Sequence, residues 1–209
     1  MNGQSFVVIS IEGQDGVGKA TQSELLRKHL IDRGLKTVRV EVPIKSLLTH
    51  KLIYFMLRRG IALRFPRLFH LIQLINKLWW QTYNLSLISL THDVLILDRW
   101  DGSYWVYGLE SGLSPREALM VYGPEMLLRP DHTFVLTGER VAQEKRDEYE
   151  KDSSLQDRVR SRFVEWANSD KNRRSLIDAN RDIDVVHRDI ISVLSKCRLI
   201  TEGIDVEKS

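Results

Sequence analysis

FVVISIEGQDGVGK, residues 6–19, is the stretch of sequence that decides the fold. It begins with a continuous run of apolar and β-branched residues, Phe6–Ile11, which is typical of a buried strand. A glycine-rich turn follows, and residues 21–33 then place leucines on one face of a predicted helix that ends at Gly34. A second short apolar run, Thr37–Val42, predicts another strand. A strand, a turn, a helix and a strand in this order predict a βαβ unit, and therefore a parallel sheet.

The glycine-rich turn fits the pattern G-x-x-x-x-G-K between Gly13 and Lys19. Glycines let the backbone curl so that successive N–H groups face one anion, and the next helix points its positive end to the same place. The pattern predicts a phosphate site that the Lys19 ammonium group reaches. It usually continues with a Ser or Thr that contacts Mg²⁺, whereas this chain has Ala20 and then Thr21. Mg²⁺ would then be held by phosphates, water and a carboxylate such as Asp98. A glycine turn without a ligand is the alternative.

Later apolar runs predict three further strands and a series of helices. The strands are expected at residues 93–97, 132–136 and 175–178. The helices are expected at residues 47–90, with breaks near Gly60 and Pro66, and at residues 114–122, 139–145, 155–168 and 182–196. We therefore predict a three-layer α/β fold with a parallel sheet of about five strands. We expect a single domain over residues 1–200 with a short polar lid at residues 146–154, followed by a polar tail at residues 201–209.

The composition excludes several classes of protein. The chain has 209 residues, 43% of them hydrophobic, and one cysteine, Cys197, which excludes a disordered chain and a disulfide scaffold. No signal peptide or long apolar run is visible, so we expect a cytoplasmic protein without a membrane partner. The net charge is +3, but residues 42–92 contain seven basic residues and no Asp or Glu. Such a segment favours an anionic partner, although a solvated helix face would have the same composition.

A second polar cluster follows the third predicted strand. Asp98, Arg99 and Trp100 stand where that strand ends, at the carboxyl edge of the sheet, where open α/β sheets bind ligands. Arg99 can bind a phosphate through two parallel hydrogen bonds. Asp98 can hold a metal-bound water or orient Arg99. The alternative is an ion pair with a purely structural role.

Two segments resemble the thymidylate kinase family: GQDGVGKATQ at residues 13–22 and DRWDGSYWVY at residues 98–107. Shorter matches follow the same order along the chain. They are Glu41-Val42-Pro43, Pro66-Arg67, Asn76-Lys77, RDEYEKDSSLQDRVRSRF at residues 146–163 and SLIDANRDIDVVHRDI at residues 175–190. The resemblance covers nearly the whole chain. It implies a P-loop NTPase fold and ATP-dependent, Mg²⁺-dependent phosphorylation of a deoxynucleoside monophosphate, with dTMP as the first candidate.

The resemblance also implies roles for the matched residues. The ATP site would consist of Gly13, Gly16, Val17, Gly18, Lys19, Ala20 and Thr21. The acceptor nucleotide would contact Asp15, Pro43, Gln73, Lys77, Arg99, Ser103, Tyr104 and Tyr107. Within that set, Asp15 would bind the 3′-hydroxyl group, Lys77 and Arg99 the phosphate, and Tyr107 would close against a ribose 2′-hydroxyl group. The catalytic residues would be Lys19, Asp98, Arg99, Arg146 and Lys151, with Asp98 organising the metal. The two lid cations, Arg146 and Lys151, are expected because Gly16 stands where some relatives carry an arginine.

The base-recognition positions depart from the family's pattern. Gln73 stands where the family stacks a phenylalanine on thymine, and Phe69 is the nearest aromatic residue. Tyr104 and Trp105 replace a polar pair that reads the pyrimidine edge. These residues either form a pocket for another or a modified nucleoside monophosphate, or pack in the core.

Further interpretations concern the basic segment and the whole chain. A stripe at helical spacing is either core or the face of a homodimer, which is the assembly that the family forms through such helices; it consists of Leu68, Leu71, Ile72, Ile75 and Trp79. A nucleic-acid site is the alternative for the basic residues, and it would use Arg58, Arg59, Arg64 and Arg67 with Trp79 and Trp80. Because Ala20 lacks a hydroxyl group, a protein that binds nucleotide without catalysis is a further alternative.

Overall fold

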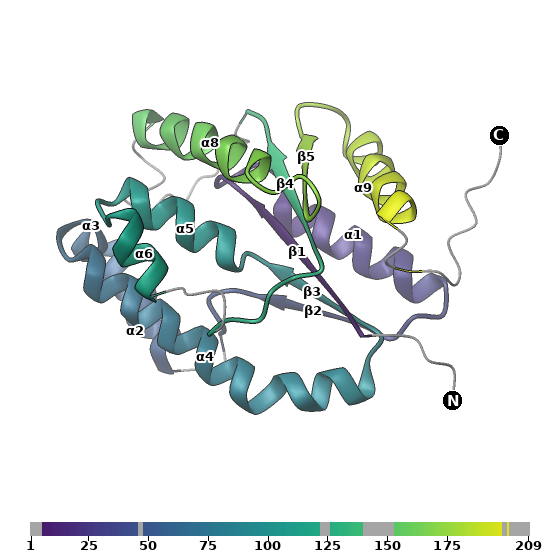
Figure 1. Ribbon diagram of the computed structural model, residues 1–209, viewed down its shortest axis with the longest axis horizontal. Helices are drawn as coiled ribbons and strands as arrows, with labels where there is room; N and C mark the ends of the chain where they lie inside the picture. Colours follow the sequence, from purple (N-terminus) through teal and green to yellow (C-terminus); the bar gives the residue numbers. More distant parts are fainter. Residues whose placement is uncertain (1–5, 46–47, 122–125, 140–152, 198–199, 201–209) are drawn as a thin grey trace.

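The computed structural model describes residues 6–45, 48–121, 126–139, 153–197 and 200, and its centre is a five-stranded parallel sheet (Figure 1). The strands are β1 (Val7–Gly13), β2 (Thr37–Glu41), β3 (Val94–Asp98), β4 (His132–Thr137) and β5 (Arg174–Asp178). Their order across the sheet is β2-β3-β1-β4-β5, so the first strand lies in the middle. The predicted parallel sheet of five strands is confirmed.

Helices cover both faces of this sheet. They are α1 (Lys19–Asp32), α2 (Leu48–Arg58), α3 (Ile61–Arg64), α4 (Pro66–Thr91), α5 (Asp101–Glu110), α6 (Pro115–Val121), α8 (Ser153–Asn168) and α9 (Ile183–Cys197). In Figure 1, α1 and α9 lie on one side of the sheet, and α4, α5 and α8 lie on the other. This arrangement is the expected three-layer α/β fold.

Buried side chains fill the space between the sheet and each helical layer. On the face covered by α1 and α9, the fully buried members of the core include Ile9, Ile11, Leu26, Leu30, Phe134, Leu136, Ile190 and Leu194. On the opposite face, two clusters pack under α4 and under α5 and α8; they include Leu95, Leu97, Trp80, Trp100, Val106, Val135 and Phe163. Because β1 and β3 are buried on both faces, their sequences are nearly continuous in apolar residues.

The long helical segment predicted for residues 47–90 is divided at the two positions that the sequence indicates. Gly60, with φ 67°, precedes α3, and Pro66 is the first residue of α4, where its missing N–H leaves no helical hydrogen bond unmade. Helix α5 is an addition to the predicted elements. The helix predicted at residues 139–145 and most of the predicted lid lie outside the described residues, and residues 153 and 154 belong to the first turn of α8.

The registers of the central strands bring the two polar sequence clusters together. Asp98 at the end of β3 pairs in register with Ile11 on one side and with Glu41 on the other. The glycine-rich turn after β1 therefore lies beside the Asp98–Trp100 segment. This carboxyl edge is where an open α/β sheet binds its ligand.

Candidate active site

The glycine-rich loop connects β1 to α1 through backbone conformations that favour glycine. Gly13 has φ 139°, and a Cβ atom there would lie 2.3 Å from the carbonyl oxygen of Leu136, so only glycine fits. Gly18 is the N-cap of α1. A Cβ atom there would meet no neighbouring atom, but its φ of 93° is a backbone conformation that residues with a side chain rarely adopt. The first turn of α1 holds no acidic residue. The positive end of this helix therefore faces the loop without a competing negative charge.

Lys19 is buried at the start of α1. Its Nζ atom donates a hydrogen bond to the carbonyl oxygen of Gln14, whose own side-chain amide donates to the carbonyl oxygen of Gly138 at 2.7 Å. Burial, together with the nearby Arg99 cation, lowers the pKa of Lys19 to about 7. The ammonium charge is therefore poorly stabilised in the free protein, and an anion in the loop would stabilise it.

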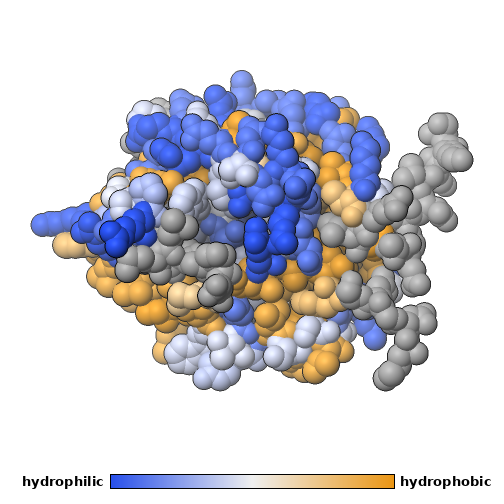
Figure 2. Space-filling view, viewed as in Figure 1, coloured by the Kyte–Doolittle hydropathy of each residue, from blue (hydrophilic) through white to orange (hydrophobic). Residues whose placement is uncertain are grey.

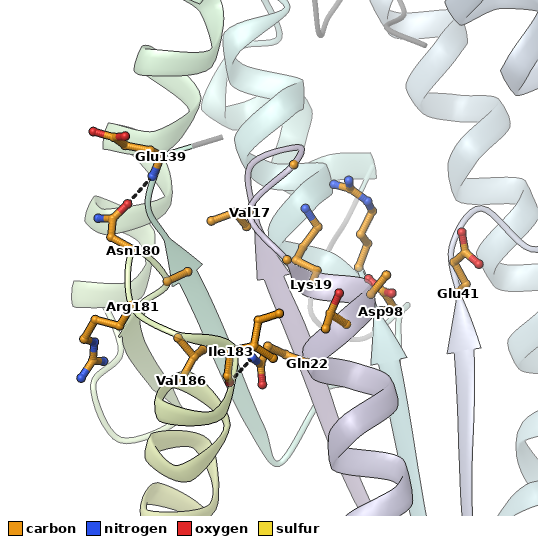
Figure 3. Close-up of a pocket in the computed structure, with 16 residues that line it drawn as sticks. Val17, Lys19, Gln22, Glu41, Asp98, Glu139, Asn180, Arg181, Ile183 and Val186 are labelled. Atoms are coloured by element: carbon orange, nitrogen blue, oxygen red, sulfur yellow. Dashed lines mark hydrogen bonds between the residues drawn. The ribbon is translucent and has the colours of Figure 1, made fainter. Parts of the chain in front are cut away.

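A large cavity of about 1020 Å³ opens in front of the loop (Figure 3). Its lining includes Gly16, Val17, Gly18, Lys19, Ala20 and Thr21, all predicted for the ATP site, together with Asp98 and Arg99. Gly13, also predicted there, forms the end of β1. Across the cavity in Figure 3 lie Glu139, Asn180 and Arg181, whereas Ile183 lies beside Gln22 of α1, whose side-chain amide donates to the Ile183 carbonyl oxygen at 2.9 Å. The Glu139 backbone N–H donates to Asn180 Oδ1 at 2.6 Å, which joins the ends of β4 and β5. The volume and the mixed lining suit a nucleotide.

The wall of this cavity opposite the loop, formed by Glu139, Asn180 and Arg181, was not predicted from the sequence. Residues 175–190 were matched to the family only as a strand and a helix, and nothing in their local pattern marks the loop after β5 as part of a cavity. The loop reaches the cavity because β5 lies at the sheet edge beside β4 and because α9 packs against α1.

A second cavity of about 330 Å³ lies between α2, α4, α5 and the segment after β2. Seven of the eight residues predicted to contact the acceptor line it, namely Asp15, Pro43, Gln73, Lys77, Arg99, Ser103 and Tyr107. Its remaining lining is mainly apolar or aromatic: Val42, Ile53, Tyr54, Leu57, Phe69 and His70, with Glu41 beside them. Arg99 and Glu41 line both cavities, so the two spaces meet at these side chains.

Arg99 is held at that junction by an ionic network. Its guanidinium group donates to Asp15 Oδ1, and the Tyr107 hydroxyl group donates to Asp15 Oδ2 at 2.8 Å. Burial alone would raise the pKa of Asp15, but the Arg99 and Lys19 cations and the Tyr107 hydrogen bond lower it to about 2. Arg99 has φ 67°, which is uncommon for a residue with a side chain. Such backbone strain persists where the surroundings hold it, and it often marks a functional site.

Glu12 is a functional-site residue that sequence reasoning missed. It is fully buried at the end of β1, and its carboxylate accepts hydrogen bonds from the backbone N–H groups of Trp100 at 2.6 Å and Ser103 at 3.0 Å. The Ser103 hydroxyl group donates to the same carboxylate at 2.5 Å. Glu12, which belongs to β1, thus caps the N-terminus of α5 and fixes the backbone around Arg99. The sequence did contain one indication of this role, because Glu12 is a single acidic residue at the end of an otherwise apolar strand.

Asp98 lies at the base of the large cavity with 3% of its surface exposed. Its Oδ2 atom accepts hydrogen bonds from the Ser23 hydroxyl group at 3.2 Å and from the guanidinium group of Arg39 in β2. Within the described parts of the chain, no group of three or more His, Cys, Asp and Glu side chains is placed to bind a metal.

Lys77 and Tyr104 are both almost fully buried. Lys77 is 1% exposed, and its Nζ atom donates to the carbonyl oxygen of Trp100 and lies 3.3 Å from the centroid of the Tyr104 ring. Burial holds the pKa of Lys77 well below its usual range. Tyr104 is 1% exposed and is not among the residues that line the acceptor cavity. The expectation that Tyr104 contacts the base is therefore corrected, since it packs behind Lys77. Trp105 packs against the core beneath α5 and α8.

The basic segment divides between paired, buried and exposed side chains. Arg67 forms an ion pair with Glu117 at 2.6 Å, and Trp80 is 6% exposed and packs edge-on against Trp100. Trp79 is exposed, and the Arg64 guanidinium group lies over the ring of Phe65. Trp80 therefore belongs to the core and cannot stack on a base as the nucleic-acid interpretation requires.

Two predicted catalytic residues, Arg146 and Lys151, lie outside the described residues. No helix in the described part of the chain is both long enough and apolar enough to cross a membrane.

Comparison with known proteins gives one consistent family. The family model described as Thymidylate kinase matches residues 11–190. The chain is 30% identical over 201 residues to the thymidylate kinase of Bifidobacterium longum (strain DJO10A), covering 87% of this chain and 94% of the relative. It is 27% identical over 198 residues to that of Thermosipho melanesiensis, covering 89% and 96%.

Solved structures of similar fold come from the same family. The thymidylate kinase of Ehrlichia chaffeensis has a TM-score of 0.72 at 21% identity, covering 91% of this chain and 99% of the other. That of Candida albicans has a TM-score of 0.75 at 22% identity, covering 93% of each chain. At such identities these likenesses show the shared fold.

Proposed function

The chain belongs to the thymidylate kinase family, and from this premise we propose that it transfers the γ-phosphoryl group of ATP to the 5′-phosphate of dTMP, giving ADP and dTDP. The observation that carries the proposal at the level of the site is the position of Arg99. This side chain lines both the large cavity at the glycine-rich loop and the smaller cavity beside α4 and α5. A phosphoryl group passing between two nucleotides would move through this junction.

ATP occupies the large cavity in this proposal. Its phosphates lie against the loop N–H groups and the positive end of α1, and the Lys19 ammonium group reaches the β- and γ-phosphates. The nucleoside extends toward Asn180 and Arg181 on the opposite wall. Mg²⁺ bound to the phosphates would offset part of their negative charge.

The acceptor nucleotide occupies the smaller cavity, with its phosphate at Arg99. Asp15 and Tyr107 lie beside the sugar, and the base extends toward Gln73 and Phe69. Lys77 supports this wall through the carbonyl oxygen of Trp100. Arg146 and Lys151 are the proposed lid cations.

Transfer requires alignment and charge neutralisation more than covalent chemistry by the protein. An oxygen of the acceptor 5′-phosphate attacks the γ-phosphorus atom, and the bond from that atom to the bridging oxygen of ADP breaks. The electron pair of the broken bond stays on ADP. Lys19 and Arg99 are placed to stabilise the charge that spreads over the transferring group.

A panel of acceptors tests the substrate. We expect ADP release from Mg-ATP to be fastest with dTMP among dTMP, dUMP, 5-substituted dUMP, dCMP, dGMP, dAMP and UMP. This expectation comes from the family, because the Gln73 amide can pair with the N3–H and O4 groups of thymine but, turned over, equally with the N3 and N4–H₂ groups of cytosine. If another monophosphate is phosphorylated faster than dTMP, that monophosphate is the preferred acceptor and the proposal of dTMP is wrong. If no acceptor supports turnover while ATP still binds, the protein is a nucleotide-binding protein without this activity.

ATP binding is expected to take up a proton above neutral pH. Lys19 in the free protein has its pKa lowered to about 7, and phosphates beside it raise that pKa, so binding must protonate the amine at higher pH. Below pH 7 the Lys19 amine is already protonated, so its titration does not change the affinity for ATP. Above pH 7 the affinity for ATP falls as pH rises, because a growing share of the protein must first bind a proton. Calorimetry at pH 8 in Tris and in Hepes, which differ in ionisation enthalpy, should show a net uptake of up to about one proton per ATP. A Lys19→Ala variant should lose this uptake, and zero uptake by the unmodified protein would contradict the assignment.

The exposed face of α4 supports a homodimer, which we also propose. Apolar and aromatic side chains repeat along this helix with 42% to 71% of their surface exposed: Leu68, Leu71, Ile75, Trp79, Tyr83 and Leu87. Figure 2 shows apolar residues gathered over the lower half of the view, where α4 runs in Figure 1. A large exposed apolar patch of this kind typically marks an interaction site. Ile72, a fifth member of the predicted stripe, is 9% exposed and belongs to the core, which is the other alternative predicted for the stripe.

Light scattering should give the mass of two 24.3 kDa chains. The double variant Leu71→Glu, Ile75→Glu should shift that mass toward one chain, because each carboxylate would be desolvated in the interface. Ser161→Glu, on the exposed side of α8, is the control and should leave the dimer intact. A monomer mass for the unmodified protein at every concentration would refute the dimer.

We propose further that residues 1–200 act as one domain. The single cysteine suits a reducing compartment, which supports a cytoplasmic location.

A further inference from the structure

Arg39 contacts Asp98, which lines the large cavity, although no sequence motif singles Arg39 out. It is in the middle of β2, and its side chain is 20% exposed. Two residues further along the strand, Glu41 pairs in register with Asp98 of β3. The long Arg39 side chain runs along the strand toward that carboxyl edge and places its guanidinium group against Asp98.

Three side chains share this contact. The guanidinium group of Arg39 donates through Nη2 to Asp98 Oδ2 and through Nε to the Ser23 hydroxyl oxygen at 2.6 Å. The Ser23 hydroxyl group lies 3.2 Å from the same carboxylate oxygen and 3.0 Å from the carbonyl oxygen of Ala20. One carboxylate oxygen of Asp98, Oδ2, thus accepts hydrogen bonds from both a cation and a hydroxyl group. Because an arginine stays protonated at every physiological pH, this neutralisation is permanent.

The first turn of α1 lacks the hydroxyl group that usually contacts the metal in such a loop. Ala20 lines the large cavity at that position, and its methyl group cannot bind a cation. Thr21 points about 100° further round the helix. Ser23 is the hydroxyl residue one turn beyond Ala20, and it is engaged by Arg39 and Asp98.

The other carboxylate on this side of the large cavity is also paired. Glu41 accepts a hydrogen bond from the Lys45 ammonium group at 2.8 Å. Mg²⁺ binds proteins through oxygen ligands, with carboxylates supplying the charge. The side chains around the described part of this cavity therefore do not fit a metal held by the protein. They fit a metal that arrives on the phosphates of the nucleotide.

We infer that Arg39 is a positioning residue that neutralises Asp98 in place of a protein-bound metal, so that metal associates with this enzyme only through the phosphates of ATP. The inference rests on the proposed function only in taking the large cavity as the ATP site. Arg39 removes the repulsion that an unpaired Asp98 carboxylate would exert on those phosphates. It also fixes the orientation of Asp98 beneath Arg99.

Binding of Mn²⁺, followed by the loss of its free electron paramagnetic resonance signal, tests the inference without any acceptor or turnover. The unmodified protein without nucleotide should leave the Mn²⁺ signal unchanged. In the complex with a non-hydrolysable ATP analogue, Arg39→Gln, which frees the Asp98 carboxylate to act as a further metal ligand beside the phosphates, should bind Mn²⁺ more tightly than the unmodified protein, whereas Arg39→Lys should not. Arg33→Gln, at the exposed end of α1, is the matched control and should behave as the unmodified protein.

A gain-of-function variant keeps the test decisive if Arg39→Gln does not fold. Ala20→Ser restores the hydroxyl group, and it should tighten Mn²⁺ binding to the complex with a non-hydrolysable ATP analogue by about 10-fold. Tight Mn²⁺ binding by the unmodified, nucleotide-free protein would overturn the inference. So would an Arg39→Gln complex with the ATP analogue that binds Mn²⁺ no more tightly than the complex of the unmodified protein. Because both readouts use metal and ATP analogue alone, they remain valid even if dTMP proves not to be the acceptor.

Discussion

Lys19→Ala should lower kcat for dTMP phosphorylation by about 10²–10³-fold. The Lys19 ammonium group is buried beside the glycine-rich loop, and its pKa of about 7 means that the free protein stabilises this charge poorly. The negative charge of the phosphates supplies the missing partner, and that charge redistributes during transfer. Removing the cation that follows the glycine-rich loop therefore removes an interaction that is stronger in the transition state than in the ground state.

Steady-state ADP release with saturating Mg-ATP and dTMP measures this effect. Lys28→Ala, an exposed lysine on the same helix, is the control for the loss of one positive charge from α1 and should retain normal turnover. Equal thermal midpoints for the two variants would show that the fold is intact. Turnover near normal for Lys19→Ala would remove Lys19 from the catalytic residues.

Arg99→Ala should also reduce turnover by about 10²–10³-fold, with a rise in the KM for dTMP. Arg99 borders both cavities, so its guanidinium group can contact the acceptor phosphate and the transferring group together. The variant also leaves Asp15 without its ion-pair partner, so the pKa of that carboxyl group should rise toward its ordinary value. Arg99→Lys keeps the charge without the fork geometry and should recover only part of the activity.

Arg129→Ala is the matched control for Arg99. Arg129 forms a half-exposed ion pair with Asp170 at 3.4 Å, and such pairs contribute about 0–1 kcal/mol to stability. It should therefore change neither turnover nor the KM for dTMP. If Arg99→Ala keeps the KM for dTMP and the kcat of the unmodified protein, the junction of the two cavities is not the site of transfer.

Local patterns were sufficient to predict the parts of the site that depend on neighbouring residues. The loop from Gly13 to Lys19 is recognisable because its glycines and lysine act at fixed spacing between a strand and a helix. The same is true of Asp98 and Arg99, since the end of a buried parallel strand locates them at the ligand-binding edge. The structure places both groups around one cavity, as these patterns indicate.

Tyr104 shows where such patterns fail. The family's spacing puts both Tyr104 and Lys77 near the acceptor. Lys77 does line the smaller cavity, but the Tyr104 ring lies behind the Lys77 ammonium group and outside that cavity. A large aromatic residue on α5 has room only in the core behind that lysine. Whether a side chain at a matched position faces the cavity or the core depends on volumes contributed by other helices, and the spacing carries no information about them.

Helix α5 is a further case. No capping residue of its own marks the start of this helix, and its side-chain pattern is weak; the Glu12 carboxylate supplies the cap from β1. A cap donated across 91 residues of sequence leaves no local signal. The contact of Arg39 with Asp98 is of the same kind, because it spans 59 residues between two strands.

The sequence by itself determined the layered α/β fold, the phosphate-binding loop and the edge of the sheet where catalysis is expected, because each follows from hydrophobic periodicity or from residues close together in the chain. Only the tertiary structure decided which acidic groups are already neutralised, which aromatic side chains are core, and how the two cavities meet at Arg99. These features depend on the register of the strands and the packing of α4, α5 and α9, which bring together side chains from distant segments. The energies of buried charges are set by such neighbours, and those neighbours exist only once the chain has folded.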